Sequence, residues 1–282
     1  MKIARIGLDQ GPRYAVVDEE GDELILLADD PLFGEGKPTG QRLRSEDVRL
    51  VSPMIPRSKV VGFGGSYPDG EPPASTDDLL VFLKPNTSVV GPDDPIVLPP
   101  HLPEVVHEVE LAVVIGRVAK DVPPERAHEA ILGYTVADDV TGVHANLAVA
   151  KGTDTFCPVG PYIETELDQS DLALASRIDG ELSREGRTSQ LAFSVPELVS
   201  HASKMFTLLP GDIVLTGSPG VRGVDPQIAS GQTVEVECEG IGRLRNPVIR
   251  RGGRMFGVEA ASRLRPSPRP WAPRSPRRCG RG

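Results

Sequence analysis

The segment Val106–Gly116, with the sequence VHEVELAVVIG, constrains the fold more than any other part of the chain. Its β-branched and aliphatic residues run up to a glycine, which favours a buried β-strand. Two carboxylates, Glu108 and Glu110, interrupt this apolar run one residue apart. Because successive side chains of a strand point to opposite faces, both glutamates are expected on one face. Val109 and Leu111 are expected to point the other way, into the core.

Two like charges beside an apolar core are costly unless a positive charge lies between them. One interpretation of the pair is a solvated strand face. The other is a site for a divalent cation. Ligands that are all oxygens are typical of a hard ion, so the sequence favours Mg²⁺ or Mn²⁺, with Ca²⁺ as the alternative.

Composition supports a globular enzyme with many turns. The chain has 282 residues, of which 39% are hydrophobic and 25% charged, and its 28 prolines and 30 glycines suit a β-rich fold. No segment has the length or apolar character of a membrane span or a signal peptide. The three scattered cysteines, Cys157, Cys238 and Cys279, are typical of a reducing compartment. We therefore expect a cytoplasmic protein without a membrane partner.

The charge distribution is uneven. Residues 250–282 carry a net charge of +9, so residues 1–249 carry −18 of the total of −9. An acidic body does not favour a nucleic-acid partner. From residue 251 to 282 Arg, Pro, Ser and Gly dominate, which predicts a disordered tail. The tail is interpreted as a dispensable extension, with an arm for an anionic partner as the alternative.

The rest of the chain divides into two predicted domains. Residues 1–55 are expected to form a small β domain with short strands at 3–7, 13–17 and 24–28, and a loop at 31–40. Residues 56–250 are expected to form the catalytic domain. Its predicted helices are at 123–131, at 142–149 and from Ser194 to Met205, the last opened by a capping box with Glu197.

Further polar groups follow predicted strands. Asp139 ends the strand Gly133–Ala137, 29 residues after Glu110, which leaves room for a helix and a return strand. Lys151 follows a short helical segment. The turn Thr216–Gly220 closes another strand, and its backbone N–H groups suit an anionic oxygen.

In this order, six segments together resemble the fumarylacetoacetate hydrolase family. The resemblance spans residues 55 to 250. The small N-terminal domain resembles that of the 2-hydroxyhepta-2,4-diene-1,7-dioate isomerase branch. The segments are Val60–Gly64, Phe82–Pro85, His107–Gly116, Gly133–Thr141, Lys151–Pro161 and Leu208–Pro219.

The resemblance implies a β-rich α+β fold, a mixed β-sandwich roll with a small N-terminal β domain, assembled as a homodimer. It implies one Mg²⁺ or Mn²⁺ held by Glu108, Glu110 and Asp139. Two alternatives stay open at Asp139: it is a helix N-cap, or Asp138 takes its place as ligand.

By the same resemblance, Lys151 reaches the substrate as a catalytic group and Thr216 contacts the substrate's carboxylate. Tyr67, Lys84 and Gly217 complete the substrate-binding set. The alternative for Lys151 is an ordinary surface lysine.

The chain departs from the family pattern in its lid. Family members that break C–C bonds carry Asn-Tyr-x-x-His-x-x-Glu, but the segment Ser66–Pro73 has Gly70 in place of the histidine and Pro73 in place of the glutamate. Asp69 and Glu71 are candidate substitutes, although the flanking prolines disfavour a short helix.

A second departure follows Asp139, where Val143 replaces the family's substrate-binding arginine. His144 is then a candidate catalytic base, with a structural histidine as the alternative. His107 is expected to face away from the metal.

The predicted function is a metal-dependent enzyme for an enolisable 2-oxo or 1,3-dicarbonyl acid, with a metal-stabilised enolate. Without the lid pair, isomerisation, tautomerisation or decarboxylation is favoured over C–C hydrolysis. The alternatives are a catalytically weakened relative that keeps the metal for ligand binding or structure, and an enzyme repurposed for secondary metabolism.

Overall fold

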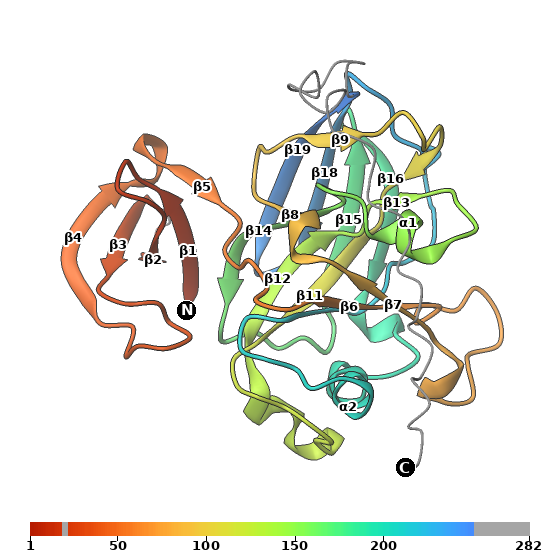
Figure 1. Ribbon diagram of the computed structural model, residues 1–282, viewed down its shortest axis with the longest axis horizontal. Helices are drawn as coiled ribbons and strands as arrows, with labels where there is room; N and C mark the ends of the chain where they lie inside the picture. The colour runs from red at the N-terminus through yellow and green to blue at the C-terminus, as the bar shows by residue number, and fades with distance from the viewer. Residues whose placement is uncertain (19–21, 251–282) are drawn as a thin grey trace, which may run out of the picture. The chain divides into compact units, whose positions relative to one another are not determined.

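The computed structural model describes residues 1–18 and 22–250, and their regular secondary structure is mostly β-strand, as predicted (Figure 1). The predicted tail at 251–282, with Cys279, lies outside the described residues. The strands of the first half are β1 Lys2–Gly7, β2 Arg13–Val17, β3 Glu23–Leu27, β4 Pro38–Arg44, β5 Arg49–Val51, β6 Val60–Gly64, β7 Leu80–Lys84, β8 Val89–Val90, β9 Ile96–Leu98 and β10 Val105–Val106. Those of the second half are β11 Val109–Ile115, β12 Ile131–Asp138, β13 Thr141–Gly142, β14 Cys157–Glu164, β15 Ala173–Ile178, β16 Glu181–Arg187, β17 Ile213–Leu215, β18 Thr233–Cys238 and β19 Gly242–Arg250.

The strands of the described residues form one large sheet, one smaller sheet and one short pair. The large sheet has twelve strands in the order β4-β3-β2-β1-β14-β12-β11-β17-β6-β7, with β5 paired to β1 and β8 to β14. The second sheet has five strands in the order β16-β15-β18-β19-β9, and β10 pairs with β13. Both sheets mix antiparallel and parallel neighbours, since β17 pairs with β6 in parallel and β19 with β9 in parallel.

The core lies between the two sheets. Apolar side chains from β11 and β12 of the large sheet pack in one cluster with those from β15, β18 and β19 of the second sheet. Leu111 and Val113 belong to this cluster, as predicted for their face of the strand, whereas Ala112 and Val114 belong to a second cluster. β11 is therefore buried on both faces, and the face that carries Glu110 is not a solvated one.

The helices differ from the predictions in two places. α2, Val195–Met205, begins with the predicted capping box of Ser194 and Glu197. The predicted helix at 123–131 is a 3₁₀ helix, η4, Pro124–Ala130. α1, Leu147–Lys151, begins later than predicted because Thr141 and Gly142 pair with β10 as β13. The remaining 3₁₀ helices are η1 Ser45–Asp47, η2 Thr76–Asp78, η3 Asn86–Ser88 and η5 Thr188–Gln190.

Two connections bear on the sequence-based expectations. The hairpin turn between β15 and β16 has φ values of 52° at Asp179 and 88° at Gly180, as a tight two-residue hairpin requires. The predicted loop at 31–40 is partly wrong, because β4 begins at Pro38 and pairs with β3. The segment 66–75 is irregular and ends at η2, in agreement with the expectation that its prolines disfavour a short helix.

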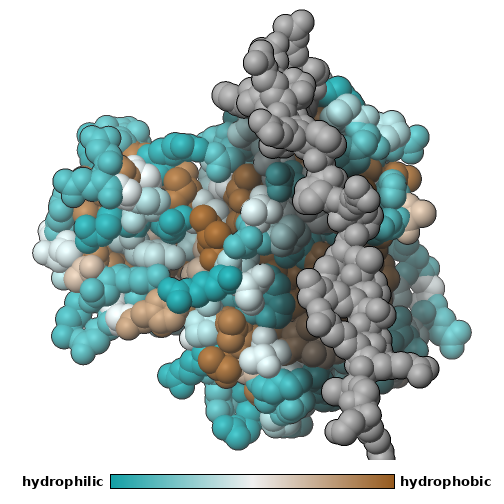
Figure 2. Space-filling view, in the orientation of Figure 1, coloured by the Kyte–Doolittle hydropathy of each residue, from teal (hydrophilic) through white to brown (hydrophobic). Residues whose placement is uncertain are grey.

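The described surface is mostly hydrophilic in the view of Figure 2, with smaller apolar patches between polar side chains. Within residues 1–18 and 22–250, no helix has the length and apolar character that crossing a bilayer requires. Cys157 and Cys238 are buried free thiols.

Candidate functional site

The pairing of β11 with β12 brings the acidic residues together. Val109 is paired with Asp138 and Glu110 with Ala137. Glu108 lies just before β11 and not inside a long strand, which corrects the prediction of one strand over 106–116. The backbone N–H of Asp139 donates to the carbonyl of Glu108 at 2.8 Å, so the pairing continues past the end of β12.

Strand alternation separates Asp138 from Asp139. Asp138 shares a face with Val136, which packs in the core between the sheets, and its Oδ1 accepts the N–H of Glu108 at 2.9 Å. Asp139 lies on the opposite face of the strand, together with Ala137, which is paired with Glu110. The register therefore supports Asp139 over Asp138 as the companion of Glu110. The N-cap alternative for Asp139 is wrong, because α1 is capped by Asn146.

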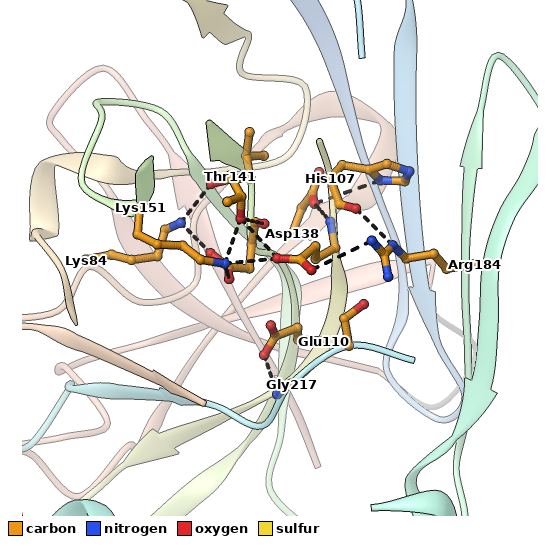
Figure 3. A network of polar contacts seen from close by, with 12 residues as sticks. Lys84, His107, Glu110, Asp138, Thr141, Lys151, Arg184 and Gly217 are labelled. Atoms are coloured by element: carbon orange, nitrogen blue, oxygen red, sulfur yellow. Dashed lines mark hydrogen bonds and ion pairs between the residues drawn. The ribbon is translucent and has the colours of Figure 1, made fainter. Parts of the chain in front are cut away.

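Lys151 ends α1 and is not a surface lysine, since only 8% of its side chain is exposed. Its Nζ donates to Glu108 Oε2 at 2.9 Å, to the Thr141 hydroxyl at 2.6 Å and to Asp139 Oδ2 (Figure 3). Burial alone would lower the pKa of Lys151, but the charges of Asp139 and Glu108 outweigh burial and raise it. Lys151 is thus held as an ammonium ion between two carboxylates.

Lys84, at the end of β7, supplies a second buried ammonium. The side chain is fully buried, and Nζ donates to Asp139 Oδ1 and to the carbonyl of Val140 at 2.9 Å. Both oxygens of Asp139 are therefore paired with a lysine. The substrate-binding role of Lys84 stays a prediction, because the contacts of its ammonium are with the protein.

Glu110 and Asp139 are both almost fully buried, with 2% and 1% exposure, whereas 25% of the Glu108 side chain is exposed. Burial, followed by the charges of Asp139 and Glu108, raises the pKa of Glu110 well above the usual value, while Lys151 and the hydrogen bond from Gly217 oppose this rise. The Gly217 N–H donates to Glu110 Oε2 at 2.6 Å. The turn thus donates a backbone N–H to a carboxyl oxygen, and in this structure that oxygen belongs to the protein.

Glycine is required at position 217. Its φ is +99°, and an added Cβ would lie 1.8 Å from Ser66 Oγ. The adjacent Thr216 hydroxyl donates to the carbonyl of Leu111 at 2.9 Å, so its predicted contact with the substrate's carboxylate stays a prediction.

Tyr67 and His144 lie in different surroundings. The Tyr67 hydroxyl is buried and has no hydrogen-bond partner among the described residues, and burial and the charge of Glu110 raise its pKa. His144 is exposed, precedes α1, and is hydrogen-bonded to Asn146. The structure does not bring His144 into the acidic cluster by any of these contacts, so its role as a base stays a prediction.

Two members of the network, Thr141 and Arg184, were missed by sequence reasoning. Thr141 Oγ1 donates to Glu108 Oε2 at 3.0 Å, and its place two residues after Asp139 was an available signal. Arg184 Nε and Nη1 donate to the carbonyls of His107 and Pro219. Nothing in the spacing of the chain relates β16 to Glu108. His107 is buried beside Asp138, and burial, aided by Arg184, lowers its pKa to about 3.

The acidic residues fit a hard divalent cation by their chemistry. Glu108, Glu110 and Asp139 all offer carboxylate oxygens as ligands. Glu108 and Asp139 both accept from the Lys151 ammonium. The charges of these two residues also raise the pKa of Glu110. As the side chains stand in the described parts of the chain, no three His, Cys, Asp or Glu residues are arranged to hold a metal ion. The lysine ammonium groups instead neutralise these carboxylates.

Comparison with known proteins identifies the class to which this fold and site belong. Residues 61–249 match the family model described as fumarylacetoacetate (FAA) hydrolase C-terminal, and residues 1–53 match the model described as Rv2993c-like, N-terminal. The chain therefore belongs to the fumarylacetoacetate hydrolase family.

Two relatives illustrate the range of similarity in sequence. Protein Rv2993c of Mycobacterium tuberculosis is 43% identical over 89% of this chain and 99% of its own length. Oxaloacetate tautomerase fahd2 of Xenopus laevis is 34% identical over 73% of this chain and 71% of its own length.

Solved structures confirm the predicted fold. The 5-carboxymethyl-2-hydroxymuconate delta-isomerase of Mycobacterium smegmatis is 41% identical, with a TM-score of 0.81 over 89% of this chain and 100% of the other. A maleylpyruvate hydrolase of Sphingobium sp. SYK-6, in complex with manganese(II) ion and pyruvate, is 29% identical, with a TM-score of 0.73 over 89% of this chain and 100% of the other.

Proposed function

We propose that this protein is a divalent-metal-dependent isomerase or tautomerase of an enolisable 2-oxo or 1,3-dicarbonyl acid, with decarboxylation as the second reaction open to the same site. The observation that carries the proposal is the position of Lys151 Nζ, between Glu108 and Asp139 and beside the buried Glu110. The family includes isomerases, a tautomerase and hydrolases by their names, which supports an enzyme of this kind.

Glu108, Glu110 and Asp139 would hold the divalent cation. When bound, such a cation supplies Lewis-acid chemistry at carbonyl and carboxylate oxygens. Mg²⁺ and Mn²⁺ both suit three carboxylates, and the manganese ion belongs to the hydrolase relative.

The chain's own residues provide charge stabilisation. Moving a double bond in such an acid transfers a proton from carbon 3 to a base, for which His144 is the candidate, and leaves negative charge on the carbon 2 oxygen until a proton is returned to the enolate. The Lys151 ammonium is held in one position by three acceptors, so its fixed positive charge can stabilise that oxygen electrostatically, and a direct hydrogen bond to the oxygen would replace one of the three contacts. Tyr67 offers a buried hydroxyl next to Glu110 for the same oxygen.

The lid supports isomerisation over C–C hydrolysis. Hydrolysis needs an activated water, and the family's His-Glu pair is replaced by Gly70 and Pro73 in an irregular segment. A proton shift between carbon and oxygen needs no water nucleophile. The absence of the His-Glu pair therefore disfavours C–C hydrolysis and leaves isomerisation unaffected.

The test is a substrate panel with the full chain and Mg²⁺ or Mn²⁺. Oxaloacetate, acylpyruvates and 5-carboxymethyl-2-hydroxymuconate are followed by enol absorbance, with product analysis for carbon dioxide. We expect metal-dependent isomerisation that falls about 100-fold or more in Lys151→Met, the usual effect of removing one such donor. Lys120→Met is the control, because Lys120 is exposed and bonded to the Lys204 carbonyl. Absence of turnover across the panel would refute the proposal and favour a ligand-binding or structural relative.

A further inference from the structure

Arg184 lies in the network but comes from the other sheet. It belongs to β16, whereas the acids lie on or next to β11 and β12 of the large sheet. Figure 3 shows Arg184 and Lys151 reaching the network from opposite sides. Only 11% of the Arg184 side chain is exposed, so the guanidinium is placed inside the site and not on the surface.

Two backbone carbonyls hold the guanidinium in one orientation. Nε donates to the carbonyl of His107 at 3.1 Å, and Nη1 donates to the carbonyl of Pro219 at 2.9 Å. Nη2 makes no hydrogen bond within the described chain, and its nearest acidic oxygen, Glu108 Oε1, is 3.7 Å away. Nη2 is held in place by the rest of the guanidinium, and its one recorded contact is the ion pair with Glu108 Oε1 at 3.7 Å, so its N–H groups can still donate to a bound carboxylate with little loss of entropy.

Glu108 separates the two basic groups. Lys151 bonds Oε2 of Glu108, while Arg184 Nη2 lies on the side of Oε1. Glu108 is also the most open of the three candidate ligands, with 25% of its side chain exposed. A ligand that contacts both basic groups without displacing Glu108 must therefore extend past this carboxylate and carry an acceptor group at each end.

The charge balance favours an anionic ligand once a metal is present. Four carboxyl groups face three basic side chains in the network, so with all four carboxyl groups ionised a bound divalent cation would leave an excess of one positive charge. The carboxylates are those of Glu108, Glu110, Asp138 and Asp139, and the basic groups are Lys84, Lys151 and Arg184.

We infer that Arg184 binds a carboxylate at the far end of the substrate, so that the site selects dicarboxylic over monocarboxylic 2-oxo acids. This inference rests on the proposed function for the reacting end of the substrate. Arg184 is then the residue that determines specificity, and the acid end beside Lys151 is common to all substrates.

The kinetic test compares oxaloacetate with its 4-ethyl ester, which lacks the far charge. In Arg184→Gln we expect KM for oxaloacetate to rise about 10- to 100-fold, the loss of one hydrogen bond to a charged group. KM for the ester and kcat for both should stay within about twofold. Arg184→Lys should raise KM for oxaloacetate less than Arg184→Gln does, since lysine keeps the positive charge but lacks the bidentate donors of the guanidinium. Arg187→Gln is the matched control, because Arg187 lies on the same strand and pairs with Asp171 outside the network.

A binding arm separates this inference from the proposed function. Calorimetry of the Mg²⁺-loaded protein with malate and lactate compares two ligands that differ in the far carboxylate and need no turnover. We expect malate to bind at least tenfold more tightly than lactate in the wild type, with the preference lost in Arg184→Gln. If Arg184→Gln acted only through the lost hydrogen bonds to the carbonyls of Pro219 and His107, it would weaken the binding of malate and lactate equally.

Equal affinities in the wild type, or a malate preference that survives in Arg184→Gln, would overturn the inference even if oxaloacetate is turned over. If no substrate is turned over but malate is preferred through Arg184, the proposed function fails and the inference stands. Should Arg184→Gln not fold, the wild-type comparison and Arg184→Lys decide the matter.

Discussion

Glu110→Gln gives the sharpest test of the acidic cluster, because its effect on stability should change sign with the metal. In the metal-free protein, Glu110 is a buried carboxylate near Asp139 and Glu108. Glutamine keeps the shape and an oxygen to accept the Gly217 N–H, while it removes a charge that burial disfavours. We expect the metal-free variant to be at least as stable as the wild type.

The size of the effect follows from linkage. When the pKa of a carboxyl group is higher in the folded than in the unfolded state, the free energy of unfolding falls as pH rises above the unfolded pKa. Each unit by which folding raises the pKa lowers the free energy of unfolding by about 1.4 kcal/mol at a pH where the group is ionised. The advantage of Glu110→Gln should therefore be larger at pH 8 than at pH 5. In the wild type, a metal ion at 100 times its Kd adds about 2.7 kcal/mol. At roughly 2–4 °C per kcal/mol, that is a rise in Tm of about 5–11 °C.

The assay is thermal unfolding of chelator-treated protein, with and without Mn²⁺, at both pH values. The wild type should show the metal-dependent rise and Glu110→Gln should not. Glu181→Gln is the control, since Glu181 is exposed on β16. A metal-free variant several degrees less stable than the wild type, or one that keeps the full rise with Mn²⁺, would refute the reasoning.

Three further predictions concern stability. Lys84→Met should lower the free energy of unfolding by about 3–5 kcal/mol in urea titrations of the metal-free protein, because Asp139 loses a buried partner; a loss below about 1 kcal/mol would contradict this. Ser194→Ala should lower it by about 1 kcal/mol through the N-cap of α2, and an unchanged midpoint would show that the cap is dispensable. Burial chiefly lowers the pKa of His201, so the wild type should lose stability as pH falls below about 6.5. That slope should flatten in His201→Gln, and equal slopes would exclude His201 as its source.

The sequence predicted those elements that are determined by neighbouring residues along the chain. The apolar run of β11 and the capping box of α2 were read from neighbouring residues alone. The start of α1 was not, because β13 forms by pairing Thr141 and Gly142 with Val106 and Val105, a contact between distant residues. The helix expected at 123–131 winds as a 3₁₀ helix, which the same residue pattern does not distinguish.

The candidate site divides in the same way. Glu110 and Asp139 could be related because they lie at defined positions of adjacent antiparallel strands. Arg184 could not, because the packing of one sheet on another brings it to Glu108. The pairing of Lys84 with Asp139 was equally hidden, since a lysine after an apolar strand is usually solvated.

The hydrogen bonding of β1 to β14 has a practical consequence for expression of this family. Ile3 is paired with Ile163, and β14 in turn neighbours β12, the strand that ends in Asp138. A truncated chain without residues 1–53 would leave that part of β14 as a bare edge, two strands from β11. Exposed edges of this kind recruit other chains. Shortened versions of the protein should therefore be judged first by whether they stay monodisperse, and only then by whether they bind metal.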